Sequence, residues 1–173
     1  MRRLLLSLGL VALLTACGEE QQAAAPPPAP LTAEATGHYC HMLLADHDGP
    51  KGQIHVAGRK DPVWFSSVRD TFAFTMLPEE SKDIRAIYVT DMGRAETWEQ
   101  PGDASWMDAR QAHYVLGSKL RGGMGQMEAV PFSDPEAARA FAAKHGGEVV
   151  AFDAVPEAYI LAQAEEKPPA HGH

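Results

Sequence analysis

Two short segments of the chain carry sulfur and imidazole groups that are suited to binding soft metal ions. The first is Cys40-His41-Met42, which offers a thiol, an imidazole and a thioether within three positions. The second is a glycine-rich loop in which Met124 and Met127 offer two thioethers. Thiolate and thioether ligands select Cu(I), and neither segment has the paired cysteines of a structural zinc site. The two segments therefore predict a Cu(I) site.

The N-terminus has the pattern of a bacterial lipoprotein signal. A basic start and an apolar run over residues 4–14 precede small residues at 15–16 and then Cys17. Residues 1–16 are predicted to be a signal peptide, and Cys17 is predicted to become a lipidated N-terminus. The apolar run is about half the roughly 20 residues of a spanning helix, so we expect an anchor on the membrane surface. Gly18 replaces the aspartate that retains lipoproteins in the inner membrane, which favours the periplasmic face of the outer membrane.

Lipidation of Cys17 would leave Cys40 as the only thiol of an exported chain. An unpaired thiol is a liability in an oxidising compartment, so it calls for a functional explanation. A thiol-dependent enzyme would use Cys40 as a nucleophile, although the sequence shows no third group to orient His41 as a base. A structural lipoprotein without catalysis is a further alternative, but it would need no free thiol. We expect a binding protein and not an enzyme.

The charge balance excludes one class of partner. The chain has 15 Lys and Arg, and without Arg2 and Arg3 the remaining 13 stand against 23 Asp and Glu, a net charge of −10. No cluster of basic residues is visible. Because affinity for phosphate backbones depends on clustered Lys and Arg, nucleic acid is not an expected partner.

The chain is predicted to divide into a tether, a folded body and a tail. Residues 17–35 are rich in Pro, Ala and Glu, which predicts a lipidated, disordered tether that holds the body off the membrane. Residues 164–173 predict a second disordered segment, in which His171 and His173 are expected to be solvated and not to bind metal. The folded body is expected over residues 36–163.

The body is predicted to be α+β. Strands are expected at residues 52–57, 62–66, 84–91, 112–116, 127–132 and 148–152. A helix is expected to begin at the N-cap Ser133, with Glu136 three residues later, and to end at Gly146. A weaker helix is expected to follow Phe65-Ser66.

A short repeat indicates an internal duplication. It consists of a Phe-Ser pair and a second Phe nine residues after the first: Phe65-Ser66 with Phe74, and Phe132-Ser133 with Phe141. Each copy follows a short predicted strand. We therefore expect two small homologous ββαβ units over residues 36–108 and 109–163, packed side by side.

Five short motifs follow one another along the chain: Tyr39-Cys40-His41-Met42, Gly122-Gly123-Met124-Gly125, Pro131-Phe132-Ser133, Ala137-Ala138 with Phe141, and His145-Gly146-Gly147-Glu148-Val149. In this order they resemble the accessory lipoproteins of nitrous oxide reductase, the NosL family. The resemblance covers the lipoprotein box and residues 38–155. It implies two homologous ββαβ units and a Cu(I) metallochaperone. Its implied partners are a membrane ABC transporter complex and, directly or through that complex, nitrous oxide reductase.

The resemblance also assigns candidate ligands. It places the cysteine-x-methionine element of the family on Cys40 and Met42, and its methionine-glycine loop on Met124 and Gly125. Some relatives carry a second cysteine shortly before the motif, and this chain does not. The third ligand therefore stays open among Met42, His41, His38 and Met127.

Overall fold

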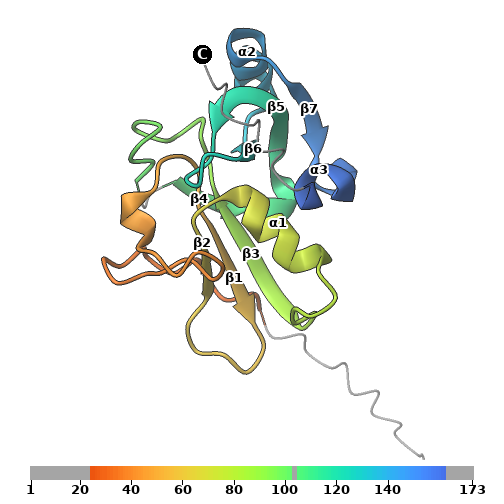
Figure 1. Ribbon diagram of the computed structural model, residues 1–173. Coiled ribbons are helices and arrows are strands. Elements are labelled where there is room, and N and C mark those ends of the chain that lie inside the picture. Colours follow the sequence, from red (N-terminus) through yellow and green to blue (C-terminus); the bar gives the residue numbers. More distant parts are fainter. Residues whose placement is uncertain (1–23, 103–104, 163–173) are drawn as a thin grey trace, which may run out of the picture.

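The computed structural model describes residues 24–102 and 105–162. Within them the chain folds as α+β with two antiparallel sheets, which confirms the predicted fold class (Figure 1). The predicted signal peptide, the lipidated Cys17, and the tail with His171 and His173 lie outside the described residues. No helix of the described ranges is long and apolar enough to cross a membrane.

The first sheet is built from four strands in the order β2-β1-β3-β4. They are β1 (Gly52–Val56), β2 (Val63–Phe65), β3 (Ile84–Thr90) and β4 (Trp106–Asp108). Helix α1 (Val68–Met76) connects β2 to β3 and packs on one face of the sheet (Figure 1). The helix begins at Ser67, whose hydroxyl accepts a hydrogen bond from the N–H of Asp70 and so satisfies a free donor of the first turn.

The second sheet is built from three strands in the order β6-β5-β7. They are β5 (His113–Arg121), β6 (Met127–Phe132) and β7 (Glu148–Ala151). Helix α2 (Pro135–His145) covers this sheet and ends at Gly146, whose φ of 79° favours glycine. The remaining helices are α3 (Glu157–Leu161) and the 3₁₀ turns Leu44–Asp46, Ala109–Gln111 and Phe152–Ala154.

The two sheets repeat one topology. In each unit the first strand is central, the second strand pairs with it as a hairpin, and the strand after the helix pairs on its other side. Phe65 pairs with Gly52 at the start of β1, and Phe132 pairs with His113 at the start of β5. The two phenylalanines of the sequence repeat therefore hold the same register position, as a duplication would produce.

Helix α1 joins the units through a shared core. One cluster of buried residues contains side chains of both sheets, and Phe72 of α1 packs edge-on against Tyr114 of β5 at 4.9 Å between ring centroids. A smaller cluster under α2 contains Val115, Val130, Phe132 and Ala138. Because α1 lies between the sheets, its N-terminus is placed beside the loop that joins β5 to β6.

The predicted start of the second helix was wrong by one residue. Asp134, not Ser133, is the N-cap of α2, and its carboxylate accepts the N–H of Glu136. The hydroxyl of Ser133 does not cap the helix, because it donates a hydrogen bond to the carboxylate of Asp91. The cap of α1, Ser67, is likewise the second residue after its phenylalanine, so both helices begin at the same place in the repeat.

Residues 24–35 differ from the disordered tether expected over residues 17–35. The side-chain amide of Gln53 exchanges two hydrogen bonds with the backbone of Ala29, at 2.8 and 3.0 Å, and Tyr88 donates to the carbonyl of Pro26 at 2.7 Å. An extended, proline-rich segment has no internal hydrogen bonds, so its backbone is free to pair in this way. The segment covers the face of the first sheet that α1 leaves open.

Candidate metal centre

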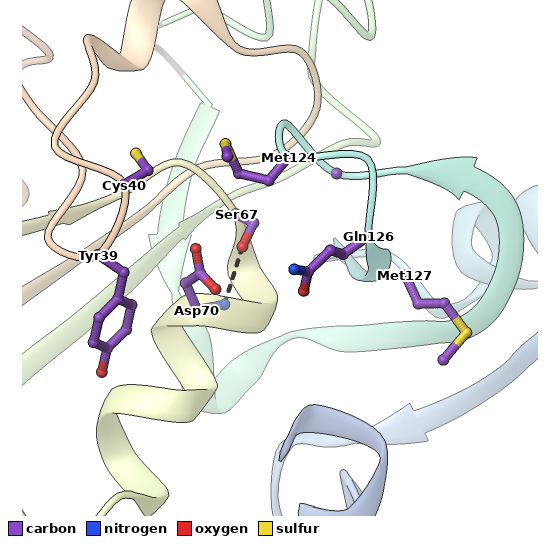
Figure 2. Close-up of a pocket in the computed structure, with 8 residues that line it drawn as sticks. Tyr39, Cys40, Ser67, Asp70, Met124, Gln126 and Met127 are labelled. Carbon is purple, nitrogen blue, oxygen red and sulfur yellow. Dashed lines mark hydrogen bonds between the residues drawn. The ribbon is translucent and has the colours of Figure 1, made fainter. Parts of the chain in front are cut away.

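A cavity of about 180 Å³ lies where the loop before β1 meets the loop between β5 and β6 (Figure 2). It is lined by Tyr39, Cys40, Ser67, Asp70, Gly122, Met124, Gln126 and Met127. Cys40 and Met124, which are far apart in the sequence, therefore line the same cavity. The N-terminus of α1 supplies the side between them.

Cys40 lies on a tight loop before the first strand. The loop closes through hydrogen bonds from Gly37 N–H to Met42 O and from His41 N–H to Gly37 O, each 2.9 Å long. His41, at the turn, has a φ of 55°, a conformation that few residues other than glycine adopt. A Cβ at Gly37 would lie 2.5 Å from the sulfur of Cys40, so only glycine leaves room for the thiol. The fold thus holds a half-buried free thiol at the cavity.

His47 faces this thiol from the far end of the same loop. Its Nε2 lies 3.9 Å from the sulfur of Cys40, and its Nδ1 lies 2.9 Å from the carbonyl oxygen of Gly123. Because a carbonyl only accepts, Nδ1–H donates this hydrogen bond, and Nε2 is the ring nitrogen that faces the sulfur. Histidines that bind metals have this arrangement, with the second ring nitrogen donating to a backbone carbonyl.

The spacing of the two donors fits a shared metal ion. With bonds of about 2.3 Å to thiolate and about 2.0 Å to imidazole, as in zinc sites, the sulfur and nitrogen would stand roughly 3.7 Å apart at 120° and roughly 4.3 Å apart in a line. The observed 3.9 Å lies between these values and is long for a direct hydrogen bond. Ser66 also places its hydroxyl 3.6 Å from the sulfur of Cys40, where it can donate to a thiolate.

Lys51 fixes the backbone that carries His47. Its buried ammonium donates to the carbonyl oxygens of His47, Asp48 and Gly49, at 2.6, 3.1 and 2.6 Å. Burial lowers the pKa of Lys51 to about 8. Three carbonyls that converge on one ammonium fold the chain back on itself after His47, which holds the imidazole beside the sulfur of Cys40.

The loop that carries Met124 is packed closely against this region. A Cβ at Gly123 would lie 2.6 Å from Cβ of His47 and 3.0 Å from the carbonyl oxygen of Ser66. The loop itself is closed by a hydrogen bond from Gly122 N–H to Gln126 O, 3.0 Å long. A glycine at position 123 is therefore what lets the methionine loop approach the histidine.

Glu128 and Arg69 brace the base of the methionine loop. The carboxylate of Glu128 is fully buried and accepts the backbone N–H groups of Val68, Arg69 and Ala129. Burial raises the pKa of Glu128 to about 8, although these donors act in the opposite direction. The guanidinium of Arg69 bonds to the side chain of Gln126. The first turn of α1 thus holds the end of the loop that leads into β6.

The two methionines of this loop differ in direction. Figure 2 shows the thioether of Met124 turned toward Cys40, whereas Met127 turns away from both of them. Met124 is 46% exposed and Met127 is 36% exposed. An exposed thioether beside a thiol has few packing contacts to explain its position, and ligation would explain it.

The other predicted ligands lie outside the cavity lining. Met42 is 44% exposed, and the side chain of His41 is exposed as well. His38 is committed elsewhere, because its Nε2 lies 3.0 Å from the carboxylate of Glu80 and its ring packs edge-on against Phe74. Of the candidates for the third ligand, the structure places only Met127 at the cavity, and its thioether points away.

The lining of the cavity contains one carboxyl group, that of Asp70, and no basic side chain. Burial raises the pKa of this carboxyl group. In the described part of the chain, no three or more His, Cys, Asp or Glu side chains gather closely enough to hold a metal. Within these residues, a third side-chain donor beside Cys40 and His47 would therefore be a thioether.

His47 was missed by the sequence analysis. It is one of eight histidines in the chain, and nothing beside it in the sequence marks it as a ligand. Its position depends on Lys51 and on Gly123, which lies in the other unit. The spacing of six residues between Cys40 and His47 was the only available signal, and it is not specific.

Comparison with known proteins identifies the family. The NosL family model matches residues 28–160. The chain is 46% identical over 164 residues to a copper-binding lipoprotein NosL of Achromobacter cycloclastes, which covers 94% of this chain and 84% of that one. It is 35% identical over 158 residues to the protein of the same description from Stutzerimonas stutzeri, covering 90% of this chain and 80% of that one.

A solved structure agrees with this result. The crystal structure of the copper chaperone NosL from Shewanella denitrificans superposes with a TM-score of 0.72 and 32% sequence identity. The match covers 77% of this chain and 99% of that chain. The resemblance noted from the sequence motifs is thereby confirmed, and the chain belongs to the NosL family.

Proposed function

We propose that this protein binds one Cu(I) ion through Cys40, His47 and Met124 and transfers it to a partner. The observation that supports this proposal most directly is the proximity of three donors from two loops: Cys40 and Met124 line one cavity, and His47 contacts the thiol of Cys40. The thiol and the imidazole nitrogen are 3.9 Å apart. The thioether of Met124 is turned toward Cys40 (Figure 2). The relatives described as copper-binding lipoproteins support the choice of metal.

The donor set favours Cu(I) over harder ions. A thiolate, a thioether and an imidazole form a soft set, whereas carboxylate and carbonyl oxygens suit magnesium or calcium. Cys40 would supply the negative charge and most of the affinity, since the thiolate is the form that binds. Met124 is neutral and weaker, so it would lower the affinity to a level that permits release.

The exposure of Met124 suits transfer. A thioether at the surface is the first ligand that a partner's donor could replace, while the buried His47 and half-buried Cys40 retain the ion. We propose that the partners are the ABC transporter complex of copper-site maturation and, directly or through it, nitrous oxide reductase. Lipidation at Cys17 would hold the protein on the periplasmic face of the outer membrane.

A thiol enzyme is the second candidate, because Cys40 and His47 form a thiol–imidazole pair of the kind that thiol enzymes use. Such an enzyme also needs hydrogen-bond donors for an oxyanion. The N–H groups of Val68 and Arg69 are bonded to Glu128, and the N–H of Asp70 is bonded to Ser67. These donors of α1 are already occupied, which favours the carrier.

An anaerobic Cu(I) titration of the protein from residue 18 onward, in competition with a coloured Cu(I) chelator, tests the proposal. We expect one ion per chain and X-ray absorption with two sulfur neighbours and one nitrogen neighbour. Cys40→Ala should lose tight binding. Retention of copper by this variant at the level of the native chain would refute the site, and thiol-dependent turnover of a model ester would favour the enzyme.

A further inference from the structure

A second cavity lies at the opposite end of the first sheet from the metal centre. Its volume is about 250 Å³, and its lining includes Ala24, Pro26, His55, Arg59, Lys60 and Arg85. The residues come from four places: the start of the described chain, the end of β1, the hairpin between β1 and β2, and the beginning of β3. We call this end, defined by Arg59, Lys60 and Arg85, the basic end.

The cations of the basic end are available to a ligand. Arg59, Lys60 and Arg85 are all exposed, and none of them forms an ion pair among the described residues. The acidic residues nearest in sequence are Asp61 and Asp83, so the local excess of positive charge is small. It nevertheless contrasts with the net charge of −8 of the whole chain.

The N-terminal segment leads to this end of the sheet. Ala29 is bonded to Gln53 at the start of β1, and Pro26 is bonded to Tyr88. Ala24 and Pro26 then line the cavity with His55 and Val56 at the end of β1. The segment therefore runs antiparallel to β1, and the described chain begins beside the β1–β2 hairpin (Figure 1).

The described chain therefore begins at the end of the sheet that lies away from the metal centre. Cys17 precedes Ala24 by seven residues, which span at most about 25 Å when fully extended. The thiol of Cys40 lies beside Ser66, at the end of β2 that pairs with the start of β1. The bonds of Gln53 to Ala29 fix the direction in which the chain leaves the body.

We propose that the basic end contacts the phosphate groups of anionic phospholipids, so that the anchored protein stands with its metal cavity turned away from the bilayer. Each Lys or Arg near an anionic membrane surface is attracted to it, and lipidation at Cys17 raises the effective concentration of headgroups at the basic end. A weak contact is then sufficient to orient the body. This inference depends on lipidation at Cys17 and not on Cu(I) binding.

Hydrogen exchange of the mature lipoprotein in vesicles tests the orientation. The protein is reconstituted in phosphatidylethanolamine vesicles with phosphatidylglycerol, and separately in phosphatidylcholine vesicles. We expect slower exchange of residues 57–61 in the anionic vesicles only, and unchanged exchange of residues 122–126. The variant R59E/K60E/R85E should lose this protection, whereas R94E/K119E/K144E, which reverses three other exposed cations, should keep it.

Several results would overturn the proposal. These are equal protection of residues 57–61 in phosphatidylcholine, protection that survives in R59E/K60E/R85E, and protection of residues 122–126 instead. In a further measurement, inorganic phosphate is added to the protein in detergent. Equal protection of residues 57–61 under these conditions would mean that the cavity binds free phosphate. If the triple variant does not fold, R59Q/K60Q replaces it, with the same loss of protection expected.

Discussion

The imidazole of His47 connects Cys40 with the methionine loop of the second unit. Its Nε2 faces the sulfur of Cys40 at 3.9 Å, while its Nδ1–H is held by the carbonyl of Gly123 at 2.9 Å. One ring thus fixes the relative position of two loops that belong to different sheets. The fold itself therefore brings the loop that carries Met124 beside Cys40 and His47.

Replacing His47 should weaken Cu(I) binding without removing a sulfur donor. His47→Ala is expected to lower the affinity by at least about tenfold, since loss of even an outer contact to a metal ligand costs about 10- to 100-fold. Chelator competition and the loss of the nitrogen neighbour in X-ray absorption measure this effect. His41→Asn is the matched control, because the side chain of His41 is exposed, whereas that of His47 is buried beside the sulfur of Cys40. Equal losses in both variants would contradict the assignment.

The methionines should differ in a ranked way. Met124→Leu keeps the volume and removes the thioether that faces Cys40, so it should reduce Cu(I) affinity and the sulfur count by one. Met127→Leu and Met42→Leu should leave both unchanged. Cys40→Ser should cost more than any of them, because it removes the only anionic sulfur. If Met42→Leu reduces the sulfur count and Met124→Leu does not, the third donor is Met42.

Local patterns predicted most of the fold. Strand alternation and the Phe-Ser repeat depend on nearby residues. Most strand positions and the helices α1 and α2 were therefore predictable. β4 and α3 were not predicted, because Trp106–Asp108 and Glu157–Leu161 are short and owe their structure to packing against the first sheet and α1. The N-cap of α2 was displaced because a distant carboxylate, Asp91, occupies the hydroxyl of Ser133.

The site was predictable only where the residue type itself carries the chemistry. Cys40 and Met124 stand out as soft donors in any context. His47 does not, since its position depends on contacts with Cys40, with Lys51 and with Gly123 of the other unit. The ordered structure of residues 24–35 likewise depends on contacts with residues distant in the sequence. Gln53 bonds to that segment from a buried position on β1, a relationship that composition cannot reveal.

Replacing Lys51 should disturb the metal centre from outside it. Lys51→Met leaves the carbonyls of His47, Asp48 and Gly49 without their common donor, and a buried acceptor without a partner costs about 1–3 kcal/mol. We expect a lower melting temperature, weaker Cu(I) binding and a changed nitrogen shell in X-ray absorption. Lys82→Met is the control, because Lys82 also donates to two carbonyls but at an exposed site. It should change none of the copper measurements.

Stability should fall as the pH rises from about 4.5 to about 8. Burial raises the pKa of Glu128 in the folded protein to about 8, from the usual value of 4.5. Between these values the unfolded chain has lost a proton that the folded chain retains. Unfolding therefore releases a proton, and its free energy decreases by up to about 1.4 kcal/mol per pH unit.

The variant Glu128→Gln checks this cause. It keeps one acceptor for the N–H groups of Arg69 and Ala129 but cannot ionise. Urea unfolding from pH 5 to pH 8 should show a flatter pH dependence for the variant than for the native protein. An identical slope for both proteins would assign the dependence to another group.

Copper should stabilise the protein as a whole, because its ligands come from both units. Cys40 and His47 precede the first sheet, whereas Met124 joins two strands of the second. A ligand present at 100 to 1,000 times its dissociation constant stabilises the folded state by about 3 to 4 kcal/mol. For a domain of this size we expect the melting temperature to rise by about 10 °C on anaerobic loading with Cu(I). Met124→Leu should retain part of this rise and Cys40→Ala none. An unchanged melting temperature at saturating Cu(I) would mean that the two units do not share the ion.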